Sequence, residues 1–395
     1  MRRLIADLVF PIHTPEIEQG ILLLKEDGTV VDVLKPSDSG YDASGAERKD
    51  GWLIPGFVNT HCHLELSHLR GKLSEKTGLD GFVEELMERR NSSEEEIENA
   101  MISADAELVR NGVVAVGDIS NGSSSFGIKA KSQIRYFTFV ERFGLDPQKA
   151  TAAYESGLRL LELLDQNAKN KCGNLSPHAP YSVSRKLFEL IAQQIRITNG
   201  VLSIHNQETA SENELFQMAT GKMHERLVRT GIIQNPFNPS GKSSIETVFD
   251  LFPENTRIQL VHNTYTSGAD LEVLESIKSR LFLCLCPGAN LFIENKLPDI
   301  PLFLKKGFTL TIGTDSLASN HQLSILSEIL LIQQAFPILP VSQLFSWATL
   351  NGAKLLGYEK ELGSFEAGKQ PGVFLLQGVD SKEKIILPSV RIIRC

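Results

Sequence analysis

The chain of 395 residues contains few cysteines and no long apolar run. Its five cysteines are odd in number, and their spacing matches neither a disulfide framework nor the CxxC pairs of zinc and redox sites. No segment has the roughly 18 consecutive apolar residues that a membrane-spanning helix needs. The N-terminus is basic and then apolar, but Asp7 and Pro11 interrupt it, so we expect a β-strand there. Together these absences predict a protein of the reducing cytoplasm.

An excess of positive charge is also absent. The sequence has 40 Lys and Arg against 48 Asp and Glu, a net charge of −8. This balance argues against nucleic acid or an anionic membrane surface as a partner, and it places no limit on small-molecule substrates. The hydrophobic content of 42% and the charged content of 22% are typical of a globular enzyme.

The middle of the chain alternates between short apolar runs and longer amphipathic stretches. Eight candidate strands lie at residues 57–61, 113–120, 135–140, 173–178, 201–205, 258–262, 281–286 and 309–315. Candidate helices lie between them, for example at residues 82–90, 93–112, 156–169 and 184–200, the last ending at Asn199-Gly200. This alternation predicts an α/β fold, a (β/α)8 TIM barrel over residues 55–359, although seven or nine strands would also fit the pattern.

Both ends of the chain differ from this middle. Residues 1–54 contain a predicted hairpin with Asp27-Gly28 at its turn, and residues 360–395 contain two further strand candidates. We therefore expect a small β-sandwich domain that is assembled from both termini. Two long connections, residues 64–92 and 207–250, are interpreted as lids over the mouth of the barrel.

Histidines close several of the candidate strands. His61 and His63 are spaced i, i+2, so on a strand both side chains point the same way and can bind one metal ion. If this pair stood alone, a surface strand with two scattered histidines would be the simpler explanation. Further strand ends, however, carry His178, His205, His262 and Asp315. The carboxyl ends of barrel strands meet at one face, so the sequence predicts a shared site there.

Six motifs occur in a characteristic order between residues 55 and 320. They are PGFVNTHCHLE, SPHAPYSVS, SIHNQET, LVHN, CPGANL and IGTDSLASN. In this combination the chain resembles the amidohydrolase superfamily, in particular its mononuclear-metal deaminase branch. The C-terminal LGSFEAGKQPGVFLL is similar to a segment of that family, but Pro371-Gly372 stands where Asp-Ala-Asp is usual. This departure falls in a structural turn and not in the site.

The resemblance implies one divalent metal ion per subunit, Zn²⁺ or alternatively Fe²⁺. Its protein ligands would be His61, His63, His205 and Asp315. Bound Zn²⁺ lowers the pKa of water to roughly 7, so a nucleophile is available at neutral pH. Binuclear relatives carry a lysine at the end of the fourth strand, where this chain has His178, and that difference favours a single metal.

The resemblance also implies how protons move. Glu208, three residues after His205, would act as general acid and base and carry a proton from water to a ring nitrogen of the substrate. His262 would orient the attacking water, and Asp315 would accept a second proton.

Four residues are expected to contact the substrate: His178, Glu65, Ser67 and Arg142. Helix capping would explain Glu65 and Ser67 equally well. An ordinary surface ion pair is the simpler explanation for Arg142.

The family resemblance implies hydrolytic deamination of an aminated purine or adenosine-like heterocycle, with release of ammonia. HLELSHLRG after the histidine pair favours adenosine derivatives, aminodeoxyfutalosine above all. Hydrolysis of a chloro-triazine or of a cyclic amide such as an imidazolone would use the same residues and stays an alternative. A non-catalytic scaffold is disfavoured, because no ligand and no general acid is replaced. Homo-oligomers are typical of the family.

Overall fold

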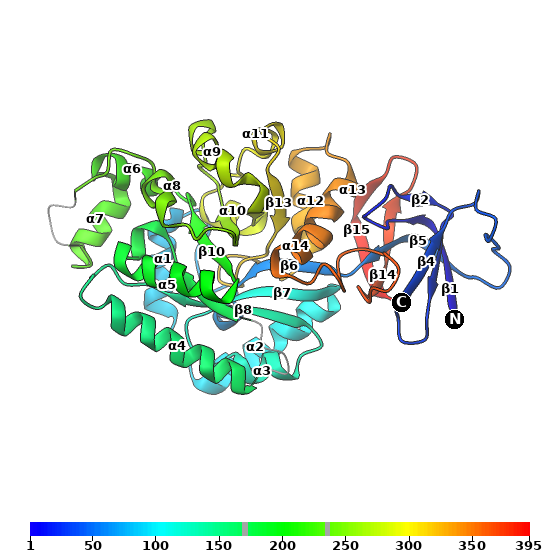
Figure 1. Ribbon diagram of the computed structural model, residues 1–395, viewed down its shortest axis with the longest axis horizontal. Coiled ribbons are helices and arrows are strands. Elements are labelled where there is room, and N and C mark those ends of the chain that lie inside the picture. Colours follow the sequence, from blue (N-terminus) through cyan, green and yellow to red (C-terminus); the bar gives the residue numbers. More distant parts are fainter. Residues whose placement is uncertain (168–172, 234–237) are drawn as a thin grey trace.

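The computed structural model describes residues 1–167, 173–233 and 238–395 (Figure 1). The end of the predicted helix at 156–169, Cys172 and residues 234–237 of the second predicted lid lie outside the described residues. Apolar runs of mostly buried residues form eight parallel strands, which make up two four-stranded sheets. The first sheet contains β6 (Phe57–Cys62), β7 (Val113–Ser120), β8 (Arg135–Arg142) and β9 (Gly173–Pro177). The second contains β10 (Val201–Asn206), β11 (Arg257–His262), β12 (Leu281–Leu285) and β13 (Thr309–Ile312).

The two parallel sheets meet at both of their edges. At one edge the backbone N–H of His205 donates to the carbonyl of His178, at 2.9 Å. At the other edge the N–H groups of Thr314 and Asp315 donate to the carbonyl of His61, at 3.1 and 3.0 Å. In the described part of the chain no continuous ladder joins the sheets at these edges. The predicted α/β architecture with parallel strands is confirmed, whereas the closure of one barrel stays a prediction.

Helices connect successive strands and cover the sheets. The longer ones are α1 (Gly78–Arg89), α2 (Glu94–Arg110), α4 (Ala150–Asn167), α5 (Arg185–Thr198), α6 (Ala210–Met218), α7 (Gly221–Arg229) and α12 (Ile325–Ala335). Shorter helices are α3 (Phe126–Lys131), α8 (Ser244–Val248), α9 (Gly268–Leu274), α10 (Pro287–Ile293), α11 (Ile300–Lys305), α13 (Val341–Ser346) and α14 (Gly352–Leu356). The ends of α5 show why this segment is helical: the Ser184 side chain caps its first turn, and Asn199 ends it in the left-handed conformation, as predicted.

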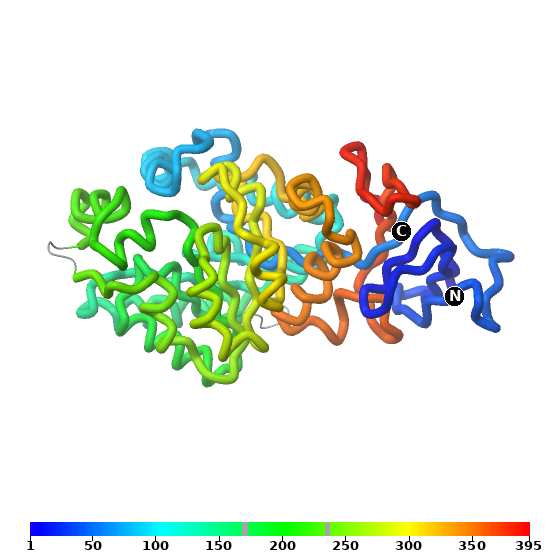
Figure 2. The backbone as a smooth tube through the Cα atoms, turned by 90° about the horizontal axis from the view of Figure 1, so that it is seen from above, coloured from blue at the N-terminus to red at the C-terminus, as the bar shows by residue number. Residues whose placement is uncertain are grey.

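Strands from both termini form one further sheet at the end of the molecule where both termini lie (Figures 1 and 2). Its strands are β1 (Arg2–Val9), β2 (Ile17–Glu18), β3 (Ile21–Leu24), β4 (Val30–Leu34), β5 (Glu47–Pro55), β14 (Val373–Asp380) and β15 (Ile385–Arg394). The order is β15-β14-β5-β1-β3-β4, with β2 on β1. Because these strands belong to a single hydrogen-bonded sheet, the predicted β-sandwich is not confirmed. The hairpin β3–β4 lies where it was predicted, with Gly28 at φ 83° in its turn.

An aromatic cluster joins the terminal sheet to the rest of the molecule. The ring of Phe10 lies 5.2 Å from that of Trp52 and 5.0 Å from that of Phe345, which belongs to α13. All three side chains are buried, and burial of one such aromatic ring contributes on the order of 1.5–3 kcal/mol.

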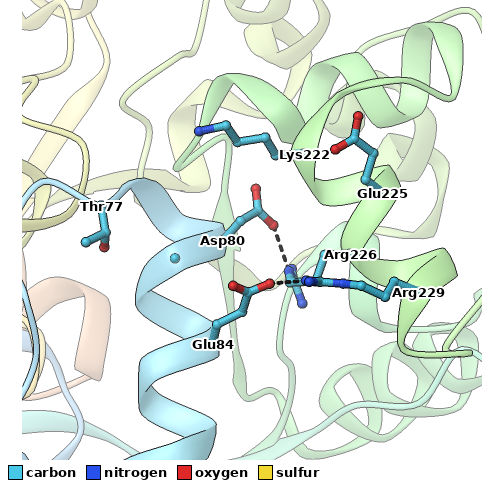
Figure 3. A pocket seen from close by; sticks show the side chains of 8 residues that line it. Thr77, Asp80, Glu84, Lys222, Glu225, Arg226 and Arg229 are labelled. Carbon is cyan, nitrogen blue, oxygen red and sulfur yellow. Dashed lines mark hydrogen bonds and ion pairs between the residues drawn. The ribbon is translucent and has the colours of Figure 1, made fainter.

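The two long connections pack against each other and form a cap. Apolar side chains of α1, α6 and α7 share one buried cluster with Tyr181, which follows β9. The cap also holds a buried ion pair, in which Arg226 Nε of α7 lies 2.7 Å from Asp80 Oδ1 of α1 (Figure 3). Among the described residues, no helix is long and apolar enough to cross a membrane.

Candidate active site

The carboxyl ends of the strands bring three imidazoles together. His61 and His63 come from the end of β6, and their Nε2 atoms lie 3.2 Å apart. His205, from β10, places its Nε2 atom 3.3 Å from that of His63. The three form a group that can hold a metal ion, and His61 is fully buried.

Asp315 completes this group from the segment after β13. Its Oδ1 atom lies 3.5 Å from Nε2 of His61 and 3.4 Å from Nε2 of His63, and its Oδ2 atom accepts a 2.6 Å hydrogen bond from Ser319. Burial raises the pKa of Asp315, but its hydrogen bond to His61 and its electrostatic interaction with the imidazole of His63 outweigh that effect and lower the pKa well below its usual range. The carboxylate is therefore ionised at neutral pH.

Burial keeps the imidazoles of His61, His63 and His178 neutral at pH 7. It lowers the pKa of His61 to about 4, against a partial rise from the hydrogen bond to Asp315. Burial likewise lowers the pKa of His63 to about 3 and that of His178 to about 4. Neutral imidazole is the form that binds a metal ion, so these residues are ready to do so at pH 7.

Hydrogen bonds fix the orientation of two of the imidazoles. Nδ1 of His205 lies 2.9 Å from the carbonyl oxygen of His178, an acceptor only, so Nδ1 carries the hydrogen and Nε2 presents a lone pair. Nδ1 of His262 lies 3.0 Å from Oδ1 of Asn290, whose amide nitrogen donates to Thr264 at 2.8 Å. Both rings therefore turn an unprotonated nitrogen toward the centre of the site.

The spacing of these donors fits a zinc-sized ion. Two nitrogen ligands at about 2.0–2.1 Å from a tetrahedral Zn²⁺ are about 3.3 Å apart. The observed separations of 3.2 and 3.3 Å between imidazole nitrogens agree with that value, and three nitrogens with one carboxylate are a common set for such an ion. The residues present therefore fit a divalent metal.

Glu208 lies beside this group, just before α6. Its Oε1 atom is 3.6 Å from Nε2 of His262, and its side chain is buried. Burial raises the pKa of Glu208 to about 8, although the neighbouring His205 lowers it in part. A carboxyl group that gains and loses a proton near neutral pH is suited to general acid and base catalysis.

The predicted substrate contacts lie at the same face of the parallel sheets. The ring of His178 is 4.9 Å from that of His205. Glu65 accepts a hydrogen bond of 2.9 Å from the N–H of Asn121, whereas the Ser67 hydroxyl donates to the carbonyl of its own 3-10 turn, at 2.7 Å. Arg142 donates to the carbonyl of Asn121 at 2.8 Å. A substrate role for these residues stays a prediction.

Three residues that the sequence analysis did not select also border the site. Glu141 lies near the end of β8 and close to His205, Asn121 follows β7, and Asn290 of α10 binds His262. For Glu141 a signal was available, because it directly follows the apolar run 135–140, as the strand-end histidines follow theirs. Asn290 lies in the motif CPGANL, but nothing in that motif by itself connects the residue with a histidine 28 positions away.

The chain belongs to the amidohydrolase family, which it matches over residues 52–390. The family resemblance and the prediction of a hydrolase that acts on carbon–nitrogen bonds are thereby confirmed.

Similar proteins cover most of the chain. The adenosine deaminase of Helicobacter pylori is 28% identical over 347 residues, 85% of this chain and 81% of that protein. A 5-methylthioadenosine/S-adenosylhomocysteine deaminase of Teredinibacter turnerae is 25% identical over 341 residues, 82% of this chain and 71% of that protein. The crystal structure of aminofutalosine deaminase from Helicobacter pylori, in complex with methylthio-coformycin, has the same fold, with a TM-score of 0.81, 24% identity and coverage of 96% of this chain and 93% of that one.

Proposed function

We propose that the protein deaminates an adenosine-like nucleoside by hydrolysis, with one zinc ion held by His61, His63, His205 and Asp315. The observation that carries this proposal is the buried Glu208 beside His262, next to three histidines that could hold a metal ion and the adjacent Asp315. The names of the similar proteins, deaminases of adenosine and its thioether derivatives, support the substrate class. Within that class we propose an adenosine derivative such as aminodeoxyfutalosine.

The residues of the site account for each proton in this reaction. A bound zinc ion lowers the pKa of a water molecule to about 7. Glu208 takes a proton from the attacking water and delivers it to the ring nitrogen next to the carbon under attack. His262, oriented by Asn290, presents its free Nε2 to the attacking water. Asp315 accepts the second proton of the water and passes it to the amino group, which leaves as ammonia, and the ring carbon keeps the oxygen.

Three further features belong to this proposal. The eight parallel strands are taken as one (β/α)8 barrel, because the sheets are hydrogen-bonded at both edges beside the site. The metal centre is mononuclear, since β9 is followed by His178 and not by a lysine. The homo-oligomeric state and the cytoplasmic location stay predictions from the sequence.

Ammonia release over a panel of adenosine derivatives, purines, triazines and imidazolones tests the substrate class. Turnover of triazines or imidazolones alone would refute it.

Zinc content and activity of Glu208→Gln test the mechanism. We expect zinc to be retained and kcat to fall by about 10²–10⁴, the usual contribution of a general acid and base. Asp270→Asn is the control, because Asp270 is a buried carboxyl whose hydrogen-bond partner is Ser267 at the start of α9.

A further inference from the structure

Glu141 is a buried carboxylate next to the metal-binding group with no role in the proposed reaction. It lies near the end of β8 and pairs in register with Ser176 of β9, where the strand ends approach the site. Its side chain is only 4% exposed. Taking such a charge out of water is costly, so its neighbours must compensate for it.

Asn121 supplies part of that compensation. Its side-chain amide donates a 2.8 Å hydrogen bond to Oε2 of Glu141. The backbone N–H of the same residue donates to Glu65, and its carbonyl accepts from Arg142 at 2.8 Å. The backbone N–H, the backbone carbonyl and the side-chain NH2 of Asn121 thus all have partners around the same strand ends. These bonds fix Asn121, which in turn holds the carboxylate of Glu141 in one position.

The other carboxylate oxygen faces His205. Oε1 of Glu141 lies 3.6 Å from Nδ1 of His205, which is too far for a hydrogen bond but close enough for a strong charge interaction in a buried site. The hydrogen on Nδ1 points to the carbonyl of His178 at 2.9 Å. When Nε2 of an imidazole binds a cation, positive charge spreads over the ring, and a negative charge beside Nδ1 stabilises that state.

We propose that Glu141, held by Asn121, is a positioning residue that strengthens His205 as a metal ligand. The inference rests on the metal centre of the proposed function and adds a residue pair to it.

A second cation site is the alternative use of the same side chains. Ligand atoms of Glu141, His178 and His205 lie within 4.8 Å of one another. Nδ1 of His205 would have to be one of these ligands, yet it already donates its hydrogen to a backbone carbonyl. His178 could offer only its Nε2, because its Nδ1 lies 2.6 Å from the Ser182 hydroxyl. The hydrogen bonds therefore favour positioning over direct ligation.

Zinc affinity of Glu141→Gln, measured by competition with a chromogenic chelator, is the test. Glutamine keeps the size of the side chain and an oxygen for Asn121, but it removes the charge beside His205. We expect the zinc dissociation constant to rise about 10–100-fold, the usual effect of losing such a partner. We also expect activity to return at saturating zinc with an unchanged KM. Asn121→Asp, which places a second carboxylate against Glu141, should weaken zinc binding in the same direction.

Two controls separate this effect from a general loss of stability. Asp270→Asn removes another buried carboxyl, and Asn111→Asp makes the same change at the opposite end of β7. Both should keep the wild-type zinc affinity.

Wild-type affinity in Glu141→Gln would overturn the inference, and so would a raised KM that excess zinc does not correct. Two zinc ions in the wild type and one in Glu141→Gln would make Glu141 a ligand instead. A wild type that binds no zinc would refute the proposed metal centre itself.

Discussion

Breaking the ion pair inside the cap should destabilise the protein strongly. Arg226 of α7 donates to Asp80 of α1 at 2.7 Å, and Ser211 donates to the other carboxylate oxygen at 3.0 Å (Figure 3). The two charged side chains are only 9% and 11% exposed. Asp80→Asn keeps the shape of the side chain but leaves the guanidinium of Arg226 buried without a counter-charge.

The expected loss follows from that burial. Removal of one partner of a buried pair costs about 3–5 kcal/mol, because the remaining charge stays out of water. Arg226→Met should cost a similar amount for the converse reason. In the double variant no unpaired charge remains, so its loss should be smaller than the sum of the single losses by about 1–3 kcal/mol.

Urea unfolding followed by tryptophan fluorescence and by circular dichroism measures these free energies. The matched control is Glu84→Gln, which breaks the neighbouring pair with Arg229 on the same two helices (Figure 3). Its side chains are 66% and 47% exposed, so its loss should stay below about 1 kcal/mol. A loss below about 1 kcal/mol in Asp80→Asn, or strict additivity in the double variant, would refute the reasoning.

Three further outcomes are expected. In Gly313→Ala the new Cβ would lie 2.7 Å from Cβ of His61, so the imidazole must move and zinc affinity should fall about ten-fold or more in a chelator competition. Asn290→Leu removes the acceptor that orients His262 and should lower kcat about 10–100-fold with zinc retained in metal analysis. The metal-free protein should lose stability as the pH falls below about 6.5. The folded-state pKa values of His61 (about 4) and His63 (about 3) lie below the usual 6.5, so between these values the unfolded chain binds more protons than the folded one. The slope should reach about 1.4 kcal/mol per pH unit for each histidine, and a urea midpoint that is constant between pH 6.5 and 4.5 would contradict it.

Strand positions were predictable because each strand is an apolar run that ends in a polar residue. The predicted strand at 113–120 coincides with β7, and the histidines at strand ends meet as expected. The strand predicted at 309–315 is too long, since β13 ends at Ile312. The strand ends there because the N–H groups of Thr314 and Asp315 donate hydrogen bonds to the carbonyl of His61. This contact joins residues that are far apart in the sequence, so the pattern of apolar residues around 309–315 does not reveal it.

The missing parts of the site have similar causes. Glu141 was overlooked because the strand was predicted to end one residue earlier, and β8 in fact continues to Arg142. The sandwich prediction for the terminal strands is not confirmed, because alternating apolar residues do not specify how many sheets they form. The parallel pairing of β5 with β1 and its antiparallel pairing with β14 decide that, and both depend on distant segments.

The joining of the two chain ends in one sheet has a consequence for biosynthesis. Pro55 of β5 pairs with Val373 of β14, more than 300 residues later. At a translation rate of about 5–20 residues per second, the nascent chain waits on the order of 15–65 s before this partner leaves the ribosome. Throughout that delay the edge of β5 that pairs with β14 has unpaired backbone N–H and C=O groups along the apolar residues Trp52, Leu53 and Ile54. Such an unpaired edge can form hydrogen bonds with strands of other chains. Chains that terminate before Val373 should therefore aggregate, whereas a tag added after the last strand should be tolerated.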